Sequence, residues 1–216
     1  MSLRRFSCLT LLLATSCAFA AAPVGNPADF AALTIRPNGS EAFDLATGVT
    51  TLPEGGTIGY KNENVTLAGA VIRYAEGDFI EIEKATVEGT FGALKAPALR
   101  FDVASQQLTA SSGATFEGPA LALSAATVEL NLNDDIAVLK GKVSSRDPDL
   151  TSSTALVDTR GRHALLVGPY EFHNGPVVLR GDAGEQLALS WSEQGDVSAS
   201  TKIAPEVQAR FASYLP

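Results

Sequence analysis

The stretch Phe79-Ile80-Glu81-Ile82-Glu83 alternates apolar and acidic side chains from Ile80 onward. Successive side chains of a strand point to opposite faces, so the two isoleucines share one face and the two glutamates share the other. The same period of two recurs at residues 127–132, which read TVELNL, and at residues 186–191, which read QLALSW. Turn-forming residues separate these stretches. The region from about residue 57 to 191 therefore predicts half-buried strands and an all-β fold.

A second regularity is the spacing of Gly113, Gly141 and Gly168, which follow one another at intervals of 28 and 27 residues. Each unit holds an extended run, a polar turn, a second extended run and a glycine. A fixed spacing of similar units is typical of repeats that stack, so the pattern predicts a stacked β repeat. An ordinary antiparallel sandwich, in which hairpins also recur, stays open as the alternative.

Composition limits the classes of function. The chain has 216 residues and a formal charge of −8, with 16 basic and 24 acidic residues. Because no basic surplus exists to neutralise phosphates, nucleic-acid binding is excluded as a leading function. With 45% hydrophobic residues, the chain has enough apolar side chains for one sizeable packed domain.

The first twenty residues have the features of a secretory signal peptide. Arg4 and Arg5 precede a short apolar run, and Ala18-Phe19-Ala20 is a small-x-small cleavage site. Cleavage there leaves 14 basic against 24 acidic residues, and it removes Cys8 and Cys17, which are the only cysteines. We therefore expect an exported, periplasmic protein without a disulfide. Lipidation of Cys17, which would tether the chain to a membrane, is the alternative.

The flanks of the strand-rich region differ from it. We expect a signal peptide at 1–20, an N-terminal flank with candidate edge strands at 21–56, a β-domain at 57–192 and a C-terminal segment at 193–216. In the last segment, Ile203, Val207, Phe211 and Leu215 recur every four residues, which predicts one short amphipathic helix. We expect this helix to dock on the open end of the sheet and to cover one edge.

No catalytic or metal site emerges from the residues. His163 and His173 are the only histidines, and both lie beside predicted turns. The acidic pairs Glu81/Glu83 and Asp134/Asp135 fit a solvated strand face and a turn better than paired catalytic carboxylates. The chain has no nucleophile elbow, phosphate loop or metal-ligand series. We therefore predict a non-enzyme that needs no cofactor and no metal.

One recurring phrase carries a resemblance to a known family. An Ala-containing strand, Ala126–Leu130, is followed by a polar turn and by the apolar run Val138–Val143, which passes through a glycine. Looser copies flank it, and the likeness covers roughly residues 64–182. The phrase resembles the OstA-like superfamily of lipopolysaccharide-transport periplasmic proteins, the LptA/LptC group. Interruptions such as Ala96-Pro97 and Gly118-Pro119 depart from the even strands of that family.

The resemblance implies a V-shaped antiparallel β-jellyroll of stacked short strands, whose two sheets hold lipid acyl chains between apolar inner faces. It also implies partners with OstA-like domains, joined through edge strands, and leaves peripheral membrane association open. A closed core made of the same residues is the alternative to a groove. The candidate lining residues are Ile80, Ile82, Val87, Leu99, Phe101, Val128, Leu130, Leu132, Val138, Tyr170, Phe172, Leu187 and Leu189.

The leading functional hypothesis is therefore a lipid-binding bridge or shuttle of an envelope transport system. A structural or adhesive exported β-repeat protein without ligand is the alternative. A carbohydrate-binding sandwich is less well supported, because one Trp and four Tyr offer few rings to stack on sugars.

Overall fold

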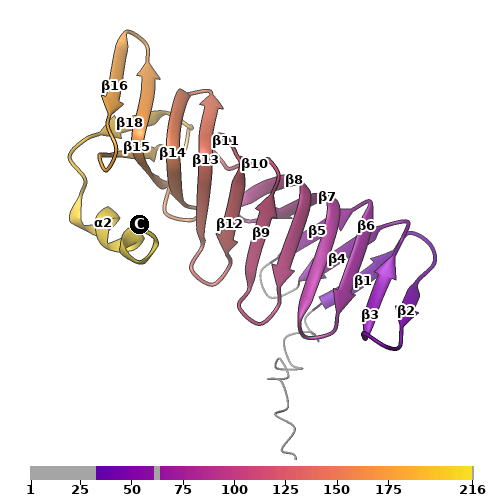
Figure 1. Ribbon diagram of the computed structural model, residues 1–216. Coiled ribbons are helices and arrows are strands. Elements are labelled where there is room, and N and C mark those ends of the chain that lie inside the picture. Colours follow the sequence, from indigo (N-terminus) through magenta and orange to yellow (C-terminus); the bar gives the residue numbers. More distant parts are fainter. Residues whose placement is uncertain (1–32, 61–63, 216) are drawn as a thin grey trace, which may run out of the picture.

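The computed structural model describes residues 33–60 and 64–215, and their strands form one elongated β-structure (Figure 1). The expected signal peptide and Cys17 lie outside the described residues. The strands are β1 (Leu33–Pro37), β2 (Ala42–Asp44), β3 (Val49–Leu52), β4 (Gly56–Tyr60), β5 (Val65–Gly69), β6 (Val71–Ala75), β7 (Phe79–Gly89), β8 (Gly92–Asp102), β9 (Gln107–Ser111), β10 (Ala114–Glu117), β11 (Ala122–Ala125), β12 (Thr127–Asn131), β13 (Ile136–Arg146), β14 (Asp149–Asp158), β15 (His163–Asn174), β16 (Val177–Gly181), β17 (Gln186–Trp191) and β18 (Val197–Ser200).

The pairings divide these strands between two antiparallel sheets. Sheet I runs in the order β1-β4-β5-β7-β8-β10-β11-β13-β14-β15-β16. Sheet II runs in the order β2-β3-β6-β7-β8-β9-β12-β13-β14-β15-β17-β18. The five long strands β7, β8, β13, β14 and β15 belong to both, one half of each strand to each sheet. The structure confirms the predicted V-shaped antiparallel jellyroll.

The two sheets meet along one side, which we call the corner, where each long strand bends. In β7 the bend falls at Lys84, which has a φ of +50°, between the pairs Glu83↔Ala98 and Ala85↔Ala96. Pro97 lies opposite in β8, where a missing N–H is tolerated because sheet pairing is interrupted there. Bulges between Lys140 and Val143, and opposite Ser153, bend β13, β14 and β15 at the same level.

Backbone hydrogen bonds and glycines hold the corner together. Gly113 N–H donates to the carbonyl of Ala126 (3.0 Å), and Ala126 N–H donates to the carbonyl of Gly141 (2.9 Å). Gly141 has a φ of +79°, which L side chains rarely adopt, and a Cβ there would lie 2.9 Å from that of Ala126. Gly168 also lies at the corner and donates to the carbonyl of Glu185 (2.8 Å). The repeat of about 28 residues is therefore one hairpin in each sheet between successive corner glycines.

The C-terminal segment forms α2 (Pro205–Phe211), followed by the 3-10 turn η1 (Ala212–Tyr214). Val207 and Phe211 are buried in a cluster with residues on the outer face of sheet II. The expectation that the helix covers an edge is therefore wrong, because outward-facing side chains of β13, β14 and β15 are apolar and supply a larger surface to cover. No helix in the described part of the chain is long and apolar enough to cross a membrane.

Arg210 fixes the helix to the sheet. Its Nε donates to Oδ2 of Asp158 at 2.7 Å, and its guanidinium also donates to the carbonyl of Asp134. The Tyr214 hydroxyl donates to the Asp134 carboxylate. A helix of seven residues is marginal by itself, so these contacts and the apolar packing hold it in place.

Candidate functional site

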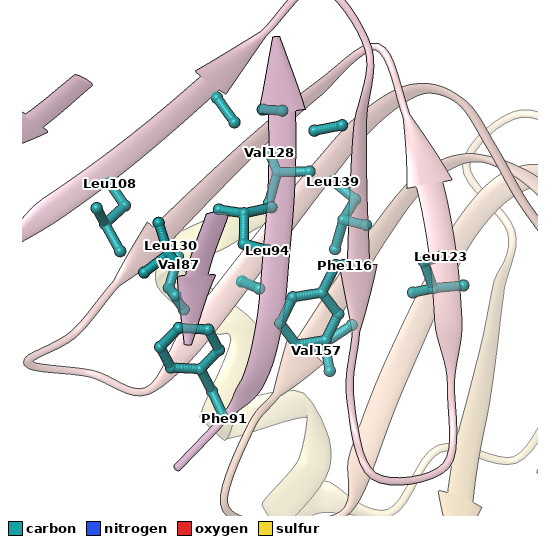
Figure 2. Packing of buried hydrophobic residues seen from close by; sticks show 14 of the residues in the cluster. Val87, Phe91, Leu94, Leu108, Phe116, Leu123, Val128, Leu130, Leu139 and Val157 are labelled. Atoms are coloured by element: carbon teal, nitrogen blue, oxygen red, sulfur yellow. The ribbon is translucent and has the colours of Figure 1, made fainter. Parts of the chain in front are cut away.

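Twelve of the thirteen predicted lining residues face the interior between the two sheets. All twelve are buried and belong to one hydrophobic cluster. Figure 2 shows part of this cluster, with Leu94 and Phe116 of sheet I beside Val128 and Leu139 of sheet II. The twelve are Ile80, Ile82, Val87, Leu99, Phe101, Val128, Leu130, Leu132, Tyr170, Phe172, Leu187 and Leu189.

Val138 is the exception. It belongs to the outer cluster under α2, together with Ile136 and Phe211. Its neighbour Leu139 faces the interior instead and pairs with Val128 in the register of β12 and β13. The prediction for Val138 is therefore wrong, because both faces of this part of sheet II are covered and consecutive apolar residues hide the alternation.

One row of inward-facing residues crosses sheet II without interruption, and we call it the edge-to-edge row. Each member is the register partner of the next, from the free edge of β2 to that of β18. Its only polar groups are the hydroxyls of Thr50 and Tyr74. The members are Phe43, Thr50, Tyr74, Ile80, Phe101, Leu108, Leu130, Ala137, Val157, Ala164, Leu189 and Ala199.

The row is buried in its middle and open at its ends. Phe101 is 1% exposed, whereas Phe43 at the β2 edge is 60% exposed. Ala199 at the β18 edge is half-buried. The apolar interior therefore reaches both ends of the jellyroll.

Side chains of the two sheets touch across the interior. The rings of Tyr60, in sheet I, and Phe101, in sheet II, lie 5.8 Å apart between centroids and are tilted by 57°. Within sheet I, Phe91 and Phe116 stack with centroids 6.4 Å apart. In this conformation, the side chains of the two sheets cover one another.

The side of the jellyroll opposite the corner, which we call the mouth, carries hairpin turns of both sheets. Apolar residues in or next to these turns are buried against the core, among them Phe91 and Leu121 from sheet I and Val103 and Leu132 from sheet II. Of these, sequence reasoning found only Leu132. Phe91, Leu121 and Val103 are single apolar residues beside polar turns. Such residues carry no periodic signal in the sequence.

The free edges at the two ends carry exposed apolar side chains. Phe43 and Leu45 are exposed beside the β2 edge, and Val177 and Val178 are exposed on the β16 edge. Among the described residues, β1, β2, β16 and β18 are each paired on one side only. Unpaired N–H and C=O groups flanked by apolar side chains suit the addition of a further strand.

The acidic and histidine candidates lie outside the interior. Glu81 is on the outer face of sheet II between Arg100 (2.9 Å) and Arg73 (3.6 Å). Glu171 accepts from Arg180 (2.8 Å) and contacts His173 Nε2 (2.8 Å). Hydrogen bonds from Arg180 and His173 lower the pKa of Glu171 to about 2. Each of these carboxylates thus has a basic partner on a solvated face.

The remaining candidates also make structural contacts. The Asp134 carboxylate accepts a hydrogen bond from the Tyr214 hydroxyl. The Asp135 carboxylate forms an ion pair with Nε of Arg160 at 2.9 Å. His163 begins β15 and is half-buried. Across residues 33–60 and 64–215, no group of three or more His, Cys, Asp or Glu is placed to hold a metal ion.

Comparisons with known proteins find a distant structural likeness and no match in sequence. No protein-family profile matches the chain. No curated protein matches it in sequence. The solved structures that match include LptH of Pseudomonas aeruginosa, the LptA-homologous periplasmic component of the conserved lipopolysaccharide transport device, at 13% identity and a TM-score of 0.25. That match covers 80% of this chain and 95% of LptH. A likeness this distant supports no statement about the ligand or the partner of this chain.

Proposed function

We propose that the chain is an exported lipid-binding bridge or shuttle of an envelope lipid-transport system, which holds acyl chains between its two sheets. The observation that carries the proposal is the edge-to-edge row. An apolar interior that reaches both ends of an elongated molecule offers a path along its length, whereas an ordinary sandwich core needs no exposed Phe43 at its edge.

The driving force is burial of the apolar chain. Each buried methylene contributes about 0.8 kcal/mol, so ten methylenes contribute about 8 kcal/mol before the cost of ordering. An acyl chain between the sheets replaces contacts such as that between Tyr60 and Phe101 with contacts to lipid. The inner side chains stay in apolar surroundings throughout, so the main cost is separation of the sheets at the mouth.

The partners we propose are OstA-like domains that join through the free edges. A strand added beside β2 or β16 extends the sheet by backbone hydrogen bonds and covers Phe43 or Val178. Since α2 packs on the outer face of sheet II over β13, β14 and β15, it does not cover the β2 edge at the other end of the molecule (Figure 1). The apolar interior of one molecule then continues into that of the next.

A structural exported β-repeat protein without ligand is the second candidate. The direct packing of the two sheets favours it, because Phe101 and its neighbours already bury one another. The two candidates differ in what the interior accepts, and this difference can be measured.

The test is native mass spectrometry of the chain purified without detergent from cells that export it. Lipid bound in a fixed ratio supports the proposal, and the same chain refolded from denaturant without lipid serves as the control. The refolded chain is expected to regain the lipid mass on incubation with envelope lipid extract. A chain that is free of lipid in both preparations favours the structural candidate.

A further inference from the structure

A hollow of about 290 Å³ lies at the mouth and is lined by turns of both sheets. Thr90 and Pro119 come from sheet I hairpins. Arg160 and Arg162 come from the turn between β14 and β15, and Trp191 ends β17. The volume suits a group of a few heavy atoms rather than a whole lipid. None of the candidate residues named in the sequence analysis lines this hollow.

The side chains lining this hollow include several hydrogen-bond donors beside the carboxylate of Glu193. Trp191 is 8% exposed, and its buried Nε1–H has no acceptor among the described residues. An indole N–H and a guanidinium can only donate. The nearby hydroxyl of Ser192 accepts from the backbone N–H groups of Gln194 and Asp196 (3.2 Å each), which leaves its own proton to donate. A ligand that fits must therefore bring acceptor oxygens.

Arg162 has a weakly held partner. Its NH1 and NH2 both lie 3.3 Å from the same oxygen of Glu193, whose side chain is 76% exposed. An exposed pair of this length contributes little, so a stronger acceptor can displace Glu193. Arg160 keeps its ion pair with Asp135 and adds positive charge to the same wall.

We propose that this mouth hollow binds a phosphate group. A phosphate group presents several anionic acceptor oxygens at neutral pH, and guanidinium groups bind it in a fork geometry. It would take the place of Glu193 beside Arg162 and receive a hydrogen bond from the Ser192 hydroxyl. The position at the mouth suits the headgroup of a lipid whose chains enter between the sheets, and for that source the inference rests on the proposed function.

Trp191 is the only tryptophan of the chain, so its fluorescence reports on the hollow directly. Titration of the purified chain with inorganic phosphate is expected to change its emission saturably. Arg162→Gln should weaken phosphate binding about tenfold, the effect of one lost hydrogen bond to a charged group. Glu193→Gln should strengthen it, because the competing carboxylate is gone. Arg73→Gln, the same charge change on the outer face of sheet II, should leave it unchanged.

Two detergents with the same chain identify the source of the phosphate. Dodecyl phosphate should bind more tightly than dodecyl maltoside, and Arg162→Gln should abolish the difference. Equal binding of both detergents, with no saturable response to phosphate, overturns the phosphate site and leaves the lipid-binding interior in place. Binding of phosphate with no binding of either detergent keeps the site and contradicts the lipid function. A loss in Arg73→Gln equal to that in Arg162→Gln also overturns the site.

Discussion

Phe101→Ala and Phe43→Ala remove the same ring from the same edge-to-edge row at positions of opposite exposure. Phe101 is 1% exposed and contacts Tyr60 across the interior, whereas Phe43 is 60% exposed. Burial of roughly 200 Å² of aromatic surface at about 25 cal/mol per Å² sets an upper bound near 5 kcal/mol. We therefore expect Phe101→Ala to lower the free energy of unfolding by about 3–5 kcal/mol. Phe43→Ala should change it by less than about 0.5 kcal/mol.

The assay is urea unfolding followed by the fluorescence of Trp191, with linear extrapolation of both variants and the parent chain. Phe43→Ala should instead weaken association through the β2 edge, seen as a smaller sedimentation coefficient of any complex that the parent chain forms. A loss below about 1 kcal/mol in Phe101→Ala, or an equal loss in both variants, would refute the packed interior with open ends.

The other predictions concern the corner, the helix and the leader. Gly141→Ala adds a close contact with Ala126 to the strain of a positive φ, whereas a Cβ at Gly113 meets nothing within 4 Å. Urea unfolding should therefore show a larger loss of unfolding free energy in Gly141→Ala than in Gly113→Ala. Equal losses would contradict the corner packing. Burial raises the pKa of Asp158, but hydrogen bonds from Arg210 and from the backbone of Gly161 and Arg160 outweigh it and lower the pKa overall. This carboxylate therefore stabilises the fold above about pH 4, and the effect is lost as the pH falls through its lowered pKa. Hydrogen exchange of α2 should therefore show early opening below about pH 4. Asp158→Asn should remove this pH dependence, and an unchanged profile would exclude Asp158 as its source. N-terminal sequencing of exported protein should begin at Ala21, whereas an acylated Cys17 would establish the lipoprotein alternative.

The strands could be predicted because sheet II alternates cleanly wherever its outer face is solvated. In β7, Ile80 and Ile82 face the core while Glu81 meets two arginines. The alternation fails in β13, where α2 covers the outer face and Val138 is as apolar as Leu139. Only knowledge of where the helix docks decides the orientation there, and residues far apart in sequence determine that docking.

The corner was visible in the sequence but not interpretable from it. Gly113, Gly141 and Gly168 mark the repeat, and Ala96-Pro97 interrupts the alternation, yet all of these lie where strands pass from one sheet to the other. The mouth could not be predicted, since Trp191 ends an alternating strand like any core residue and Arg162 lies in an ordinary polar turn. Their proximity arises from the closure of the two sheets.

Photo-crosslinking in cells tests the central claim, that lipid lies between the sheets, most directly. A photoreactive phenylalanine is placed at position 101, 130 or 172, all facing the interior, and at position 138, which is equally buried but lies under α2. The account predicts lipid adducts at the three interior positions and none at 138 in folded protein. Crosslinks from position 101 only to the chain itself, such as to Tyr60, with no lipid adduct at 130 or 172, would contradict it.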